Sequence, residues 1–127
     1  MSDIVRTESL VKRYDGTLAV AGVDLAVQSG EIFGLVGPNG AGKTTTLRIL
    51  ATLLAPSAGT AEIAGMSVTR NPDEVRRVIG FMPDSFGVYD DMKVWEYLDF
   101  FARCYGIAPA ARRRVIGDLL ELSLIHI

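Results

Sequence analysis

One glycine-rich stretch constrains this chain more than any other. Residues 37–45 read GPNGAGKTT and match the pattern G-x-x-x-x-G-K-[ST]. An apolar run, residues 32–36, precedes this stretch, and an amphipathic segment begins at Thr44. This order predicts a strand, a tight turn and a helix, which is the context in which the pattern is specific. We therefore expect a nucleoside triphosphate to bind here, rather than an ordinary glycine-rich turn.

The residue types of this stretch suit an anion site. Its glycines permit positive φ angles, so backbone N–H groups can gather around a phosphate. The helix that begins at Thr44 adds unpaired N–H groups and the positive end of its dipole. Lys43 would place an ammonium beside the β- and γ-phosphates as the catalytic cation, and the Thr44 hydroxyl would bind Mg²⁺. The predicted nucleotide-binding residues here are Gly37, Pro38, Asn39, Gly40, Ala41, Gly42, Lys43, Thr44 and Thr45.

Composition narrows the class of protein. The 127 residues are 49% hydrophobic and 22% charged, which is typical of a globular domain. A net charge of -2 argues against a broad nucleic-acid surface. The single cysteine, Cys104, excludes an internal disulfide and fits a reducing compartment. No apolar window is long enough to span a bilayer and the N-terminus is charged, so we expect a cytoplasmic chain that reaches a membrane only by docking on another protein.

Periodicity predicts the elements. Residues 4–13 and 19–27 alternate around a turn at 14–16, which predicts an antiparallel hairpin. Residues 32–36 and 78–82 are continuously apolar, as in strands of a parallel sheet buried on both faces. A short strand is expected at 60–63.

Helices are expected after the glycine-rich stretch, at 71–77, at 94–105 and from 109 to about 121. The first should bury Leu47, Leu50, Ala51 and Leu54, and Asn71 should cap the second. The third carries an aromatic stripe that we assign to core or to a partner surface, and Arg112, Arg113 and Arg114 should form a solvated face of the last.

Several segments together resemble a known family. Tyr14, residues 30–46, 56–59, 63–65 and 79–83 occur in the order found in the ATP-binding subunit of ABC transporters, from about residue 4 to 121. Residues 94–106 resemble the branch of multidrug and polysaccharide-type exporters. The resemblance implies an α/β fold, a P-loop NTPase (RecA-like) core with an N-terminal antiparallel β subdomain over residues 1–84. The start of a helical subdomain would follow over 85–121.

The resemblance also implies roles for single residues. Tyr14 would stack on the adenine ring, and Val20 would add an apolar contact to the base or ribose. Asp84 stands where most of the family has glutamine, so it would bind Mg²⁺, while the positioning of water is in doubt. The implied cofactors are ATP and Mg²⁺. The implied partners are a membrane-spanning permease, which would hold the chain on the inner face of the cell membrane, and a second ATP-binding subunit arranged head to tail.

The motifs that the family uses for hydrolysis do not occur in these 127 residues. There is no acidic pair after a later strand and no Leu-Ser-Gly-Gly-Gln-like segment, and His126 reads as a tail residue. Residues 122–127 do not resemble the family and look like a translated sequencing adapter, so we expect an incomplete N-terminal portion. Such a chain should bind Mg-ATP without turning it over, and the apolar faces of 32–36 and 78–82 should be partly uncovered.

Two other functions stay open at this point. A non-catalytic nucleotide-binding or regulatory module is compatible with the missing motifs. A small P-loop kinase would need an arginine-rich lid, for which only residues 112–114 are candidates.

Overall fold

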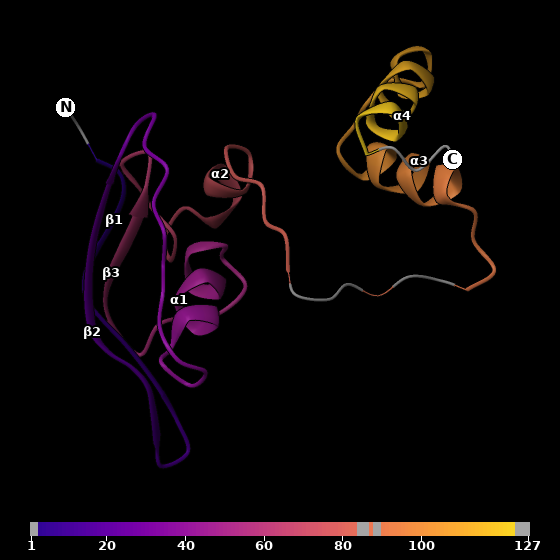
Figure 1. Cartoon of the computed structure of the whole chain (residues 1–127). Coiled ribbons are helices and arrows are strands. Elements are labelled where there is room, and N and C mark those ends of the chain that lie inside the picture. Colours follow the sequence, from indigo (N-terminus) through magenta and orange to yellow (C-terminus); the bar gives the residue numbers. More distant parts are fainter. Residues whose placement is uncertain (1–2, 84–86, 88–89, 124–127) are drawn as a thin grey trace. The chain divides into compact units, whose positions relative to one another are not determined.

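The structure is a computed structural model that describes residues 3–83, 87 and 90–123. The chain divides into two compact units, Met1–Met82 and Pro83–Ile127 (Figure 1). The first unit contains β1 (Asp3–Tyr14), β2 (Thr17–Gln28), α1 (Lys43–Leu50), β3 (Ala58–Ile63), β4 (Met66–Ser67) and α2 (Pro72–Arg76). The second contains α3 (Val94–Cys104) and α4 (Pro109–Ser123). The boundary expected after residue 84 stays a prediction, because residue 84 itself lies outside the described residues.

The first unit is built on an antiparallel sheet with the strand order β2-β1-β3-β4. The predicted hairpin is confirmed: β1 and β2 pair through a tight turn that brings Tyr14 opposite Thr17. The predicted short strand is also confirmed within β3, which pairs with β1 so that Val5 lies opposite Ile63. The N-terminal antiparallel subdomain implied by the sequence is therefore present.

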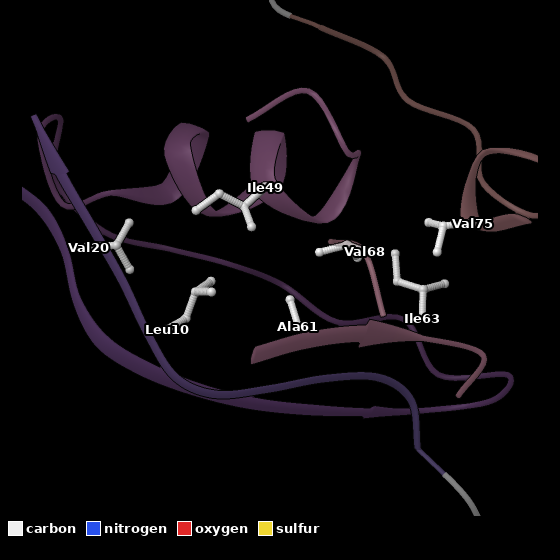
Figure 2. Close-up of a cluster of buried hydrophobic side chains, with 7 residues drawn as sticks. All are labelled: Leu10, Val20, Ile49, Ala61, Ile63, Val68 and Val75. Carbon is white, nitrogen blue, oxygen red and sulfur yellow. The ribbon is translucent and has the colours of Figure 1, made fainter. Parts of the chain in front are cut away.

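One face of this sheet carries the hydrophobic core, and α1 lies over it (Figure 2). The buried side chains converge between the sheet, α1 and the residues that follow β3, and they are Leu10, Val20, Ile49, Ala61, Ile63, Val68 and Val75. Non-directional burial of apolar surface is the main source of stability in such a cluster. The core thus fixes the helix that begins at the glycine-rich stretch onto the hairpin.

The buried face of α1 differs from the predicted one. Thr46 and Ile49 are its fully buried residues, whereas Leu47 is exposed. The other predicted contacts are confirmed: Ala51 is buried, and Leu50 and Leu54 are partly buried against the core. The helix also ends at Leu50 rather than near residue 54, and Thr52 takes a left-handed conformation directly afterwards. The predicted face is therefore wrong only at Leu47, and the buried Thr46 beside it belongs to the contact face instead.

Residues 32–36 and 78–82 do not form the expected strands. Neither segment pairs with another strand in the part of the chain that the structure describes. A strand buried on both faces exists only with neighbours on its edges, so without partners these segments stay irregular. Their apolar side chains are partly uncovered as expected: Ile32 is 100% and Val36 95% exposed and Met82 is on the surface, whereas Ile79 packs against the core.

α2 confirms a short helix where one was predicted, with Pro72 in its first turn. Asn71 occupies the N-cap position, yet its side chain makes no capping hydrogen bond, so the expected cap is wrong in that respect. Acidic side chains in the first turn, Asp73 and Glu74, favour the helix start through its dipole instead.

The second unit is a pair of helices held by a shared carboxylate. Asp99 of α3 accepts hydrogen bonds from Arg103 at 2.9 Å and from Arg112 of α4 at 3.0 Å. Arg112 also donates to the Ile107 carbonyl and is mostly buried, so the solvated face predicted for the three arginines holds only for Arg113 and Arg114. Among the residues of α3, which carries the predicted aromatic stripe, only Ala102 is buried. None of the described helices has the length and apolar character needed to cross a bilayer.

The first prediction concerns a buried hydroxyl at a break in the β1–β2 register. Thr7 Oγ1 donates to the Val23 carbonyl and accepts from the Leu25 N–H, both at 2.9 Å. Thr7→Val would leave both groups without this partner and should lower the free energy of unfolding by about 1–3 kcal/mol, measured by urea denaturation. Thr60→Val, at an exposed position of β3, is the matched control and should change the free energy of unfolding by less than about 0.5 kcal/mol. Equal effects would contradict the assigned role of the Thr7 hydroxyl.

The second prediction follows from the exposed apolar segment before the glycine-rich stretch. We expect a broad thermal transition and concentration-dependent association by light scattering, because Ile32 and Val36 present apolar surface to water. Replacing both by glutamine should reduce association and barely change stability, since neither side chain is packed. A sharp melt together with a monodisperse monomer at all concentrations would refute this.

Candidate phosphate-binding site

The glycine-rich stretch forms a small open pocket at the start of α1. Residues 38–45 line this pocket, whose volume is about 280 Å³. The Ala41 N–H donates to the Pro38 carbonyl at 3.2 Å, which closes a turn ahead of the helix. The first N–H groups of a helix have no intrahelical acceptor, so those of α1 are suited to an anion. The turn and the helix start that the sequence predicts are therefore present, although the strand expected before them is not formed.

Gly42 fixes this loop against the hairpin. It is the N-cap residue of α1, with φ 91° and ψ 9°. A Cβ at this position would lie 2.5 Å from the Ala19 carbonyl oxygen of β2 and 3.4 Å from a methyl carbon of Val20. Both the left-handed conformation and the close approach exclude any side chain. The predicted glycine is thus required by a contact as well as by its φ angle.

The Lys43 ammonium lies against the loop itself. It donates hydrogen bonds to the carbonyl oxygens of Gly37 and Pro38, the latter at 3.0 Å. These acceptors are neutral, whereas a phosphate oxygen carries negative charge and attracts the ammonium by Coulomb interaction as well. A phosphate entering the loop would therefore compete well for this group. The structure thus brings Lys43 to the loop where the sequence expects the cation.

The threonines after Lys43 divide between the pocket and the core. Thr44 is exposed and Thr45 is half-buried, and both line the pocket. Thr46 is buried against the sheet, and its N–H donates to the Gly42 carbonyl at 2.9 Å. The helix therefore holds two hydroxyl-bearing residues at the loop and uses the third for packing.

The residues present fit Mg²⁺ only as a companion of bound phosphates. Mg²⁺ keeps several waters and takes one or two protein oxygens together with phosphate oxygens. The Thr44 hydroxyl is such an oxygen. Within the described residues no group of three or more His, Cys, Asp or Glu side chains could hold a metal ion. Asp84, the other predicted ligand, lies outside the described residues.

The turn between β1 and β2 lies at the same end of the sheet as the start of α1 (Figure 1), and Tyr14 is the last residue of β1 before this turn. It pairs with Thr17, and Ala19, which is two positions further along β2, touches Gly42. The ring is 46% exposed, and the Lys12 ammonium lies 5.3 Å from its centroid. The structure therefore brings the predicted base-stacking residue and the predicted phosphate loop to one end of the molecule's first unit.

Val20 lies elsewhere in this arrangement. Its side chain is 2% exposed and belongs to the core, where it supports Gly42 from the hairpin (Figure 2). A direct contact between Val20 and a base or ribose stays a prediction.

Sequence reasoning missed two residues near the site. Nothing in the sequence marks Ala19, whereas Lys12 could have been found from strand alternation, because it precedes Tyr14 by two positions on the same strand.

A glycine-rich loop with the pattern G-x-x-x-x-G-K-[ST] that opens a helix is the local arrangement of a P-loop nucleotide-binding site. Comparison with known proteins then identifies the family. The sequence profile of the ABC transporter family matches residues 20–126. The chain belongs to the ABC transporter family. This match excludes the small P-loop kinase as an interpretation.

Individual relatives agree with this family. The chain is 40% identical over 126 residues to the probable multidrug ABC transporter ATP-binding protein YbhF of Escherichia coli (strain K12), covering 97% of this chain and 22% of YbhF. It is 44% identical over 117 residues to the daunorubicin/doxorubicin resistance ATP-binding protein DrrA of Streptomyces peucetius, covering 92% of this chain and 36% of DrrA.

A solved structure supports the fold. The ATP-binding subunit of an ABC transporter superposes with a TM-score of 0.77 at 29% sequence identity, over 93% of this chain and 49% of that one. The predicted fold class is therefore confirmed, although the expected parallel strands are not formed in the described residues. The chain spans less than half the length of each of these proteins.

The third prediction tests the contact between the loop and the hairpin. Gly42→Ala would force its Cβ onto the Ala19 carbonyl and should lower the free energy of unfolding by more than about 2 kcal/mol, measured by urea denaturation. Gly40→Ala is the matched control: φ is 86° there, but no atom lies within 4 Å of the added carbon. It should cost only the conformational penalty of about 1–2 kcal/mol. A smaller effect at position 42 than at position 40 would contradict the close approach.

Proposed function

We propose that this protein is the ATP-binding subunit of an ABC transporter and binds Mg-ATP to power export through a separate membrane subunit. The observation that carries the proposal is the loop before α1, where Lys43, Thr44 and Thr45 line one pocket that Gly42 holds against β2. The position of Tyr14 at the same end of the sheet supports a ligand that carries a base, and adenine is proposed from the ATP-binding relatives.

The proposed binding mode follows from the loop. The N–H groups at the start of α1 face the phosphates, and the Lys43 ammonium exchanges its two carbonyl acceptors for β- and γ-phosphate oxygens. Bound Mg²⁺ would neutralise developing charge between these phosphates. Thr44 offers it a hydroxyl oxygen, and Thr45 lies towards the α-phosphate side. Because positioning and charge are the main means of phosphoryl-transfer catalysis, these residues form one half of an ATPase site.

Tyr14 supplies the proposed platform for the base. Its ring is half-exposed at the end of β1, and an aromatic face binds a base by stacking without any specific hydrogen bond. Val20 stays a candidate for an apolar contact, although its burial limits the surface that it presents. Asp84 stays a proposed Mg²⁺ ligand on the evidence of its place in the sequence alone.

Partners and location are proposed from the family and its relatives. The names of YbhF and DrrA describe a probable multidrug transporter component and a drug resistance component. By analogy, this protein would dock on a membrane-spanning permease from the cytoplasm and pair head to tail with a second ATP-binding subunit. A trans subunit is also what supplies the family's Leu-Ser-Gly-Gly-Gln-like segment, which the present 127 residues do not contain.

The fourth prediction tests nucleotide binding. Lys43→Ala should weaken Mg-ATP binding, measured by titration calorimetry, by about ten- to one-hundred-fold, since it removes charged hydrogen bonds to phosphate. Arg48→Ala removes an exposed cation from the same helix and should leave affinity unchanged. If both variants bind Mg-ATP like the unmodified chain, the loop is not the binding site.

The fifth prediction separates binding from turnover. The 127-residue chain should release no phosphate from Mg-ATP above background, because it carries neither the acidic pair nor the trans segment that the family's mechanism needs. Phosphate release is measured at saturating Mg-ATP, with Lys43→Ala reporting contaminating activity. Steady release that disappears in Lys43→Ala would show that these residues suffice for hydrolysis. A non-catalytic nucleotide-binding module predicts the same absence of turnover, so that alternative stays open.

A further inference from the structure

We propose that Lys12 is a positioning residue that sets the Tyr14 ring for stacking on the base of the nucleotide. This inference rests on the proposed function, because it concerns how the same site recognises a base. It adds a residue to which neither the phosphate-loop pattern nor the family resemblance assigned a role.

The geometry places one ammonium between two parts of the site. Lys12 Nζ donates a hydrogen bond to the Ala55 carbonyl at 2.7 Å and lies 5.3 Å from the centre of the Tyr14 ring. Ala55 belongs to the segment that follows α1, the helix that carries the phosphate loop. The Lys12 side chain is half-buried on β1. A single group therefore joins the end of the hairpin to the segment that follows the loop-bearing helix.

This arrangement limits the freedom of an otherwise mobile ring. Tyr14 is 46% exposed at the end of β1. A cation within about 6 Å of an aromatic centroid attracts the ring, by about 0.5–1 kcal/mol at exposed sites. Because the Ala55 carbonyl holds the ammonium, the ring is drawn to a defined position relative to α1. Ordering the ring before binding removes part of the entropy cost of stacking.

Lys12 acts through Tyr14 rather than on the phosphates. It is absent from the residues that line the phosphate pocket, all of which fall within 38–45. Its ammonium donates to the Ala55 carbonyl, which follows α1 in the sequence, whereas the phosphate loop precedes α1. Loss of a residue that binds the phosphates would lower the affinity for every triphosphate alike. Loss of a residue that orients the base platform would lower the affinity only for ligands with a base.

The experiment compares Mg-ATP with inorganic tripolyphosphate, which has no base, by titration calorimetry on the full chain. Lys12→Met keeps the apolar stem and removes the charge, so ATP affinity should fall about two- to five-fold while tripolyphosphate affinity is unchanged. Lys12→Gln keeps a donor for the Ala55 carbonyl without the charge and should show the same base-dependent loss in a chain of normal stability. Lys12→Arg should restore ATP affinity.

Two controls complete the test. Arg13→Met removes a positive charge from the next position of β1 and should change neither affinity. In a Tyr14→Ala background, Lys12→Met should have no further effect on ATP binding, because the two residues act as one unit.

Three results would overturn the role of Lys12: unchanged ATP affinity in both neutral variants, equal losses for ATP and tripolyphosphate, or additive losses in the double variant. Binding of neither ligand by the unmodified chain would instead refute the proposed function, and the inference with it.

Discussion

The close approach of Gly42 to the Ala19 carbonyl is the contact on which the site depends. It lies where the phosphate loop becomes α1 and where the hairpin passes beneath, with Val20 packed next to it. Any side chain at position 42 would push α1 away from the sheet, because a close-packed interior has no room for an added carbon. Everything proposed for the site requires this junction: the helix start that faces the phosphates, the cation of Lys43 and the nearness of the Tyr14 ring.

The sheet and the site are coupled through the same few residues. Val20 and Ile49 lie in one core, so burial that stabilises the hairpin also holds α1 in place (Figure 2). Lys12 repeats this coupling at the surface, through the Ala55 carbonyl. The antiparallel sheet is therefore the support of the nucleotide site as well as a separate layer of the fold. That the chain belongs to the ABC transporter family agrees with this arrangement.

Local patterns predicted the local parts of this structure. Alternation and a turn predicted the hairpin, and the glycine pattern predicted the loop and the position of Lys43. The failures involve partners that lie far away in the sequence. Residues 32–36 are apolar enough for a buried strand, but apolar character cannot name the strands beside it. On α1 the predicted stripe failed at Leu47, which is exposed, while the polar Thr46 beside it is buried and apolar periodicity does not mark a threonine as core. The Lys12–Ala55 bond joins residues 43 positions apart and leaves no local signal.

The exposed run before the loop has a further consequence. The phosphate loop is anchored through Gly42 on its C-terminal side, while Ile32 and Val36 on its N-terminal side touch little. An unpacked segment before the loop has to be ordered when an anion enters, and that ordering reduces the net affinity. Any protein surface that covered Ile32 and Val36 would immobilise the free side in advance. The affinity for nucleotide would then depend on whether Ile32 and Val36 are covered by another protein surface.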